Sequence, residues 1–357
     1  MSDAAAVKPV IARYKPYYME LDAGRTYHWC ACGRSKRQPL CDGSHRGTGI
    51  SPVPYVPAQD GEEVLFCGCK QSGTAPFCDG AHNNLLDRYE EDDAGSAANR
   101  RIAAVAADPD GKARLDGSCF VCAVDALRLN RNGVLGWAPV IGAADGALFQ
   151  SQFYFRCEAG GDSPVVGFGD RHVVLLVTGG AGEIEVGDRR FPVGENTGIY
   201  VRPGEAFQLH SRGTAPLAAY AAVCPLAEAP DWPVAMPAFD AAHPDRAIGI
   251  DPAQRQAMAD RFFQMMIGKP HGSEVVTQFI GEIPLSKAMP HRHLYEESLI
   301  ILRGRGMMWT ETRRAPVAAG DVIFLPRKQL HSLQCTDPAG MLLAGVIYPG
   351  DNPSINY

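Results

Sequence analysis

Two short stretches of the chain repeat one set of metal-binding residues at identical spacing. In each stretch, two cysteines bracket a single residue, eight residues separate the second cysteine from a third, and a histidine follows four positions after the third. The two sets are Cys30, Cys32, Cys41 and His45, and Cys67, Cys69, Cys78 and His82. Thiolates with one imidazole bind zinc, copper(I) or an iron–sulfur cluster, and the number of ligands alone does not choose among them.

The residues between the ligands recur as well, because one serine, one proline, one aspartate and one glycine stand at matching offsets in both stretches. They are Ser35 and Ser72, Pro39 and Pro76, Asp42 and Asp79, and Gly43 and Gly80. The full pattern, C-x-C-x2-Ser-x3-Pro-x-C-D-G-Ser/Ala-H, resembles the fingerprint of the CDGSH iron–sulfur proteins, the mitoNEET-like family. This resemblance implies one 2Fe-2S cluster per motif and a tandem domain over residues 1–95 that pairs its two motifs within one chain.

Histidine ligation has a physical consequence of its own. Replacing an anionic thiolate with a neutral imidazole removes negative charge from the cluster and raises its reduction potential, as in Rieske centres. The clusters are therefore plausible electron carriers. Two alternatives remain open, namely zinc in place of the clusters, and clusters that only stabilise a small domain by supplying folding energy.

Composition describes a globular protein of two or three domains. The chain has 357 residues, 46% hydrophobic and 21% charged residues, and a formal net charge of -6. No basic excess predicts nucleic-acid or membrane binding, and no apolar run is long enough for a bilayer. The N-terminus has no secretory pattern, and six of the eleven cysteines belong to the two motifs. We therefore expect a protein of the reducing cytoplasm.

The rest of the chain has the pattern of an all-β protein. An acidic connector over 87–99 precedes short Val, Ile, Leu, Phe and Tyr runs separated by Gly, Pro, Asp and Asn, which indicates sandwiches or barrels. A proline-rich stretch interrupts this pattern, and residues 254–267 have spacing compatible with a helix. The predicted domains are a barrel over 100–228, a connector with a helix over 229–270, and a second barrel over 271–357.

A second metal constellation lies in the last of these domains. His291 and His293 are two positions apart, so on an extended strand they point to the same face, and Glu297 keeps that parity. His331 follows a Gly-Asp turn and an apolar strand that could return it to the same interior. Imidazole and carboxylate ligands suit iron(II), manganese, nickel, copper or zinc, and four protein ligands leave positions open on an octahedral ion.

This stretch resembles the cupin superfamily. Its first motif, H-x-H-x3-E-x6-G, is met by His291, His293, Glu297 and Gly304, and its second is met by Gly320, Pro326 and His331. Lys328 and Cys335 replace a glycine and an asparagine of the second motif. The earlier β region is similar to a cupin barrel that has lost its metal ligands. The resemblance implies a mainly β fold, in which the tandem CDGSH domain precedes two cupin barrels, a bicupin.

The combination predicts a non-heme iron oxygenase or oxidase. In this hypothesis two 2Fe-2S clusters relay electrons to Fe(II) held by His291, His293, Glu297 and His331, and a small-molecule substrate and dioxygen meet at that metal. Gln278, Tyr295 and Trp309 are the candidate substrate-pocket residues, and a ferredoxin or flavin reductase is the candidate electron donor. The alternatives are a redox-silent cupin hydrolase or isomerase with structural or regulatory clusters, and a redox or iron sensor whose cupin domain binds an effector.

Overall fold

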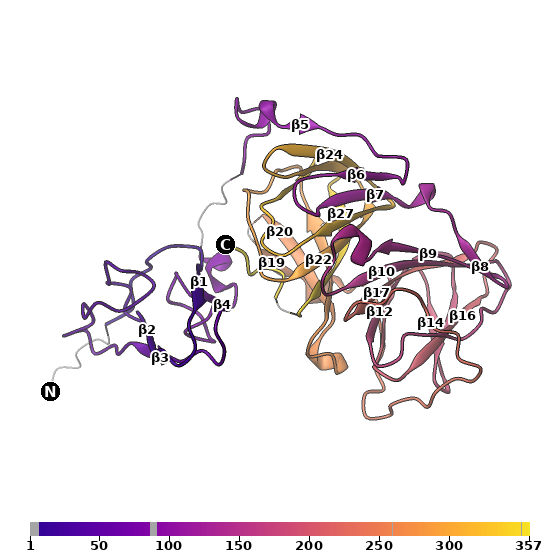
Figure 1. Cartoon of the computed structure of the whole chain (residues 1–357), viewed down its shortest axis with the longest axis horizontal. Coiled ribbons are helices and arrows are strands. Elements are labelled where there is room, and N and C mark those ends of the chain that lie inside the picture. The colour runs from indigo at the N-terminus through magenta and orange to yellow at the C-terminus, as the bar shows by residue number, and fades with distance from the viewer. Residues whose placement is uncertain (1–6, 86–90, 259, 351) are drawn as a thin grey trace.

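The computed structural model describes residues 7–85, 91–258, 260–350 and 352–357. These residues form β-strands and short 3-10 helices and contain no α-helix. A small N-terminal domain lies beside two packed β-barrels, and the C-terminus lies between that domain and the second barrel (Figure 1). The predicted mainly β fold is confirmed. None of the helices within these ranges has the length and apolar character that crossing a membrane requires.

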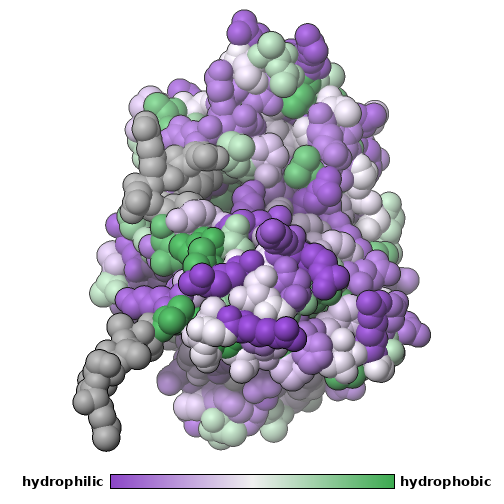
Figure 2. All heavy atoms as spheres, turned by 90° about the vertical axis from the view of Figure 1, so that its left-hand side faces the viewer, coloured by the Kyte–Doolittle hydropathy of each residue, from purple (hydrophilic) through white to green (hydrophobic). Residues whose placement is uncertain are grey.

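The N-terminal domain consists of two short antiparallel ribbons. Its elements are β1 (Tyr17–Leu21), β2 (Tyr27–Trp29), β3 (Val53–Tyr55), β4 (Glu62–Phe66) and the 3-10 helix η1 (Ala81–Asn84). β1 pairs with β4 and β2 with β3. Leu21, Trp29, Val64 and Phe66 form a small buried core. The outer face of this domain is mostly hydrophilic, with only small apolar groups (Figure 2).

The first barrel consists of a seven-stranded sheet and a four-stranded sheet. The larger sheet has the order β18-β15-β12-β17-β10-β9-β8, and the smaller has the order β11-β16-β13-β14. Its strands are β8 (Asn130–Asn132), β9 (Leu135–Ile141), β10 (Ser151–Cys157), β11 (Val166–Gly167), β12 (His172–Gly179), β13 (Gly182–Val186), β14 (Arg189–Val193), β15 (Gly198–Val201), β16 (Ala206–Ser211), β17 (Leu217–Cys224) and β18 (Ala247–Ile248). Valine, leucine and phenylalanine side chains from both sheets fill its interior.

The second barrel pairs an eight-stranded sheet with a four-stranded one. The orders are β19-β20-β21-β27-β22-β25-β7-β6 and β26-β23-β24-β5. Its strands are β5 (Ala103–Ala104), β6 (Lys112–Arg114), β7 (Phe120–Ala123), β19 (Gln256–Met258), β20 (Arg261–Ile267), β21 (Thr277–Ile283), β22 (Glu296–Arg303), β23 (Arg305–Trp309), β24 (Arg313–Ala318), β25 (Asp321–Leu325), β26 (Ser332–Cys335) and β27 (Met341–Tyr348). The remaining 3-10 helices are η2 (Asn99–Arg101), η3 (Val124–Ala126), η4 (Ala143–Asp145), η5 (Pro252–Gln254) and η6 (Lys269–His271).

Strand exchange between the barrels corrects the predicted boundaries. β7 pairs with β25, so residues 103–123 complete the second barrel although they precede the first one in the chain. The two-residue strand β18, from the proline-rich connector, pairs with β15 of the first barrel. The helix expected within 254–267 is a wrong prediction, because the described residues 256–258 and 261–267 form strands β19 and β20. The Phe and Ile side chains of β20 suit a strand, and its pairing with β21 favours the strand over the helix that the spacing also allowed.

The two barrels share a buried interface made by the outer faces of their larger sheets. Tyr200, Tyr220, Ile280 and Phe324 belong to one apolar cluster there. The Glu296 carboxylate accepts hydrogen bonds from the backbone N–H groups of residues 148, 149 and 150, at 2.7, 2.9 and 3.1 Å. The barrels are therefore fixed to each other by apolar burial and by a satisfied buried carboxylate.

Candidate metal centres and the cleft between them

Each Cys-x-Cys pair of the N-terminal domain begins immediately after a strand. β2 ends at Trp29 and β4 at Phe66, so the next residues are Cys30 and Cys67. The backbone N–H of Cys30 donates to the Pro39 carbonyl and that of Cys67 to the Pro76 carbonyl, both at 2.8 Å. The two sequence repeats therefore fold as structural repeats, down to individual hydrogen bonds.

The residues that recur between the ligands hold the motif loops in place. Ser35 Oγ donates to the Leu40 carbonyl and Ser72 Oγ to the Phe77 carbonyl, both at 2.6 Å. The Asp42 and Asp79 carboxylates each accept two backbone N–H groups of their own loop. Gly43 and Gly80 have φ of 95° and 87°, a left-handed conformation that favours glycine. The serine, aspartate and glycine therefore position the candidate ligands of each loop.

The ligand atoms of each motif come together as two pairs. Cys30 and Cys32 Sγ are 3.7 Å apart, and Cys67 and Cys69 Sγ are 3.5 Å apart. Cys41 Sγ lies 3.1 Å from His45 Nδ1, and Cys78 Sγ lies 3.5 Å from His82 Nδ1. A single tetrahedral zinc needs all four ligands close to one point, whereas a two-iron cluster takes two ligands on each iron. Because no three of the four candidate atoms of either motif, all of which belong to described residues, lie within 4.8 Å of one another, the paired arrangement fits the binuclear cluster better than a single zinc.

Lys70 is buried between the two motifs. Its ammonium donates to the Cys67 carbonyl at 2.9 Å and lies 4.6 Å from the centre of the Trp29 ring. Burial lowers the pKa of Lys70, and the thiols of Cys30 and Cys67 oppose this. A cation shared by both Cys-x-Cys pairs stabilises the negative charge that two thiolate-bound clusters would carry.

The four predicted barrel ligands lie together at one end of the second barrel. Glu297 is on β22, His291 and His293 are on the segment that precedes it, and His331 immediately precedes β26. The backbones of His291 and His331 form a β-bridge, and their rings are 4.4 Å apart. His293, Glu297 and His331 have ligand atoms within 4.8 Å of one another. Within the described ranges, this is the one group of three or more such residues that is compact enough to share an ion.

The three histidines are oriented alike by backbone carbonyls. Nδ1 of His291, His293 and His331 lies 2.9, 2.8 and 2.8 Å from the carbonyls of residues 289, 295 and 329. Each Nδ1 therefore carries the proton, and each Nε2 keeps a lone pair, as in metal-binding histidines. Burial lowers the pKa of His291 to about 3 and that of His331 well below its ordinary value, so both rings are neutral.

An orphaned polar atom tests whether an ion fits here. His293 Nε2 is buried without a hydrogen bond, and it lies 3.1 Å from Glu297 Oε2. A buried unsatisfied nitrogen beside a carboxylate costs free energy unless a further partner binds it. A divalent cation satisfies both groups, and three imidazoles with one carboxylate suit the transition metals named above.

The three predicted pocket residues lie in different places. Tyr295 stacks on His293 and lines the pocket beside the ligands. Trp309 lies on the other side, where it lines a cavity with His331, and its indole N–H donates to Gln334. Gln278 is a correction, because it donates to the Leu175 carbonyl across the barrel interface. Strand alternation on β21 turns its neighbour Phe279 inward instead.

The pocket beside the ligands is small and mainly apolar. It encloses about 90 Å³ and is lined by His291, His293 and Glu297 together with aromatic and aliphatic side chains. Arg261, at the start of β20, is the buried cation of this pocket and was missed because the segment was interpreted as a helix. As a strand, the alternation of β20 would have turned Arg261 and Phe263 to the same inner face.

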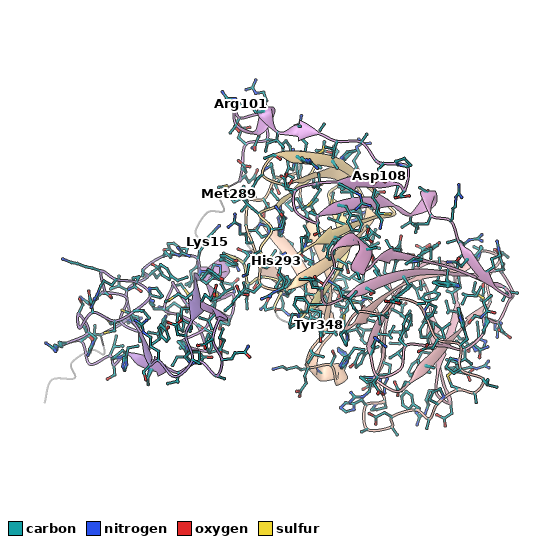
Figure 3. All side chains as sticks on the ribbon, in the orientation of Figure 1. Lys15, Arg101, Asp108, Met289, His293 and Tyr348 are labelled. Atoms are coloured by element: carbon teal, nitrogen blue, oxygen red, sulfur yellow. The ribbon has the colours of Figure 1, made fainter. Side chains whose placement is uncertain are left out.

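A cleft of about 370 Å³ separates the second motif from the barrel site. Cys78 lines it from the N-terminal domain and Tyr295 from the barrel. Lys15 and His293 lie on the facing sides of the two domains (Figure 3). The Lys15 charge adds to burial in lowering the pKa of His82 in the second motif and of His291 in the barrel. The second motif is thus the one that adjoins the barrel.

The C-terminal segment 352–357 fills the space between the second motif and the barrel. Asn83 donates to the Ser354 carbonyl at 3.0 Å, and Asn352 donates to the Asp79 carbonyl at 3.3 Å. Pro353 and Asn356 line the barrel pocket. Tyr357 stacks on Tyr18 of the N-terminal domain, with ring centres 5.3 Å apart. The sequence contains no local signal for these contacts.

Comparisons with known proteins agree with both halves of the structure. The family described as "Iron-binding zinc finger CDGSH type" matches residues 10–46, "AraC-like ligand binding domain" matches 166–276, and "Cupin domain" matches 282–345. CDGSH iron-sulfur domain-containing protein 3, mitochondrial, is 58% identical over 50 residues in Mus musculus and 54% in Homo sapiens. These matches cover 13% of this chain and 36% and 39% of the relatives, so the chain spans little more than a third of their length.

Solved structures support the barrels. Protein Ylba from E. coli has a TM-score of 0.52 and 14% identity, covering 72% of this chain and 99% of its own. Oxalate decarboxylase from Lactobacillus farciminis has a TM-score of 0.51 and 10% identity, covering 65% and 87%. At these identities the likeness shows the fold alone. Residues 10–46 therefore match the CDGSH iron-binding type, residues 282–345 match a cupin domain, and the barrels have a cupin-like fold.

Proposed function

We propose that the protein is a metal-dependent oxidoreductase in which two 2Fe-2S clusters supply electrons to iron(II) in the second barrel. The observation that carries this proposal is the shared cleft, because Cys78 of the second motif and Tyr295 of the barrel line the same cavity. The ligands proposed for the clusters are the two Cys3His sets, and those proposed for the iron are His291, His293, Glu297 and His331.

In this proposal, individual residues of the chain have separate roles. Tyr295 lies against His293 and faces the second motif, so it provides aromatic contact between the two centres. Lys70 holds positive charge between the motifs. The carbonyls that orient the three histidines keep Nε2 available for the ion. Iron(II) at this site supplies dioxygen activation, and two one-electron clusters match the two electrons that mono-oxygenation of a substrate consumes.

The cellular setting follows from the same chemistry. Electrons must enter from an external donor, for which a ferredoxin or a flavin reductase is suitable. The thiols outside the motifs, including Cys119 and Cys224, are free and buried. We propose a reducing compartment such as the cytoplasm, where free thiols persist.

The deciding experiment combines metal analysis, paramagnetic resonance and single-turnover kinetics on the full chain. Protein with chemically reduced clusters is mixed with dioxygen and candidate substrates, and product formed without added reductant is measured. We expect up to one product per two reduced clusters. Cys78→Ser should abolish this yield while iron remains in the barrel, whereas His331→Ala should remove the barrel ion and leave the clusters. Unchanged product from Cys78→Ser protein would contradict the relay.

A second candidate function is favoured by one observation, namely that segment 352–357 contacts the second motif and also lines the barrel pocket. Loss of the second cluster would release this segment and change the pocket. The protein would then be a redox or iron sensor with an effector-binding barrel. Effector binding that changes with cluster state, without product under dioxygen and reductant, would favour the sensor.

A further inference from the structure

The pocket beside the barrel ligands contains a buried arginine whose hydrogen bonds are incomplete. Arg261 is 7% exposed. Its Nη2 donates to the Leu333 carbonyl at 3.2 Å, while its Nε is buried without a hydrogen-bond partner. A buried guanidinium N–H that has lost water and gained no acceptor costs free energy, so the site favours a ligand that supplies the acceptor.

The Asp260 carboxylate lies beside Arg261 Nε but is badly placed to accept a hydrogen bond from it. Its Oδ1 lies 3.5 Å from Arg261 Nε without forming a hydrogen bond, and the same oxygen is also unsatisfied. Its Oδ2 accepts the Ser286 hydroxyl at 2.7 Å, which holds the carboxylate to one side. Asp260 therefore partly balances the charge of Arg261, but the Nε–H group of Arg261 still has no hydrogen-bond acceptor.

The other walls of the pocket define the remainder of the ligand. Phe263, Phe279, Leu299 and Leu343 supply apolar surface, and His291, His293 and Glu297 supply the metal side. The volume of about 90 Å³ is well below that of an engineered apolar cavity of about 150 Å³ that holds benzene, so the pocket encloses roughly four non-hydrogen atoms, namely a carboxylate and the first carbon of the chain attached to it.

We propose that Arg261 binds the carboxylate of a small aliphatic acid whose chain lies against Phe263, Phe279 and Leu343, beside the barrel metal. The guanidinium fork matches a planar carboxylate, and the pair is stronger in a dry pocket than in water. The assignment rests on the proposed function only in placing the substrate in this pocket.

Binding of butyrate tests the assignment against its neutral isostere, butyramide. Titration calorimetry uses the full chain with clusters intact and zinc in the barrel, without dioxygen or reductant. We expect butyrate to bind at least about tenfold more tightly than butyramide, as a charge-assisted pair requires. Arg261→Met should remove this preference, and Arg261→Lys should retain part of it. Equal affinity for the two ligands in the unmodified protein overturns the assignment.

Two further variants separate Arg261 from other causes. Asp260→Asn removes the competing carboxylate and should tighten butyrate binding, which decides the matter even if Arg261→Met does not fold. His331→Ala weakens the barrel metal site, and the preference for butyrate should persist without the ion. A preference that vanishes with the ion assigns the carboxylate to the metal and overturns the role of Arg261. Because turnover is not measured here, this outcome leaves the electron relay to its own test.

Discussion

The ring of Tyr295 stacks on the imidazole of His293, with ring centres 4.2 Å apart and planes inclined by 11°. Tyr295 also lines the cleft that contains Cys78, and its hydroxyl donates to the Pro353 carbonyl at 3.3 Å. The side chain of Tyr295 thus contacts one candidate barrel ligand and the C-terminal segment, and it also lines the cleft beside the second motif. Substitution of Tyr295 therefore tests directly whether electrons pass between the N-terminal domain and the second barrel.

Replacing Tyr295 with leucine should slow electron transfer from the reduced clusters to an oxidised barrel ion. Tyr295→Phe keeps the stacked ring and loses only the hydroxyl, so it should transfer electrons at nearly the normal rate. Losing an aromatic pair costs about 1 kcal/mol, which leaves both variants folded. Rapid-freeze paramagnetic resonance of the ferric barrel signal measures the rate. Identical decay in the leucine and phenylalanine variants would show that the ring is not needed.

Alanine at the two motif glycines should have different consequences. Gly43 and Gly80 share a positive φ, so alanine costs each about 1–2 kcal/mol in the left-handed region. A Cβ at Gly43 meets nothing within 4 Å, whereas one at Gly80 would lie 2.1 Å from Ser354 Oγ. Gly80→Ala should therefore displace the C-terminal segment, and Gly43→Ala should not. Hydrogen exchange of residues 352–357 measures this, and equal exchange in both variants would contradict the predicted contact.

The sequence was sufficient for features set by local spacing and insufficient for those set by distant packing. The proximity of the candidate ligands was predictable because Cys30 and Cys32, or His291 and His293, are close neighbours in the chain, and their spacing determines which way their side chains point. Gln278 was assigned to the wrong face of its strand. Alternation shows which residues share a face, but it does not show which face points inward until one inward-facing residue is known. Three features depend on partners far away in the sequence. They are the pairing of β7 with the second barrel, the formation of strand β20, and the position of the C-terminal segment against the second motif.

Exchanging a cluster histidine for cysteine should lower one reduction potential at a time. The added thiolate brings negative charge to the cluster, so His45→Cys or His82→Cys should lower the potential of its own cluster by on the order of 100 mV or more. Spectroelectrochemical titration of the visible absorption measures both clusters in one sample. If either variant leaves the titration curve unchanged, that motif does not hold a redox-active cluster with histidine ligation.

Acid should weaken the contact between the N-terminal domain and the second barrel. Glu63 accepts a hydrogen bond from Arg327 at 2.9 Å and also pairs with Lys328. Although burial opposes it, the bonds from Lys328 and Tyr18 and the charge of Arg327 lower the pKa of Glu63 below 4.5. Because the folded pKa is depressed, the stabilisation is present above 4.5 and is lost as pH falls through the folded value.

The measurement for this contact is small-angle scattering between pH 7 and pH 3. The particle should lengthen toward the acidic end as the domain separates. Glu63→Gln should lengthen it already at pH 7, whereas Glu62→Gln, which removes a carboxylate paired with Tyr55 within the domain, should not. A Glu63→Gln particle of normal dimensions at pH 7 would exclude this carboxylate as the anchor.

The first motif should be the entry point for electrons from an acidic donor. Arg34, Lys36, Arg37 and Arg46 are exposed around its ligands, although the chain as a whole carries a net charge of -6. The second motif instead has a buried lysine, Lys70, and is in contact with the C-terminal segment through Asn83. A local basic surface on an acidic protein accelerates encounter with an acidic partner, and salt screens this effect.

Reversal of charge at Lys36 and Arg37 together should slow cluster reduction by an acidic ferredoxin at low salt, by about tenfold or more if steering governs encounter. The difference should shrink as salt rises, because only the encounter is affected. Stopped-flow absorbance at several ionic strengths measures the rate, and the double variant Lys269→Glu with Arg303→Glu, an equal change of charge at exposed positions outside the first motif, is the matched control. If the control slows reduction as much as the variant at Lys36 and Arg37 does, net charge alone explains the effect. Slowing confined to Lys36 and Arg37 places donor docking at the first motif and leaves the second motif to face the barrel.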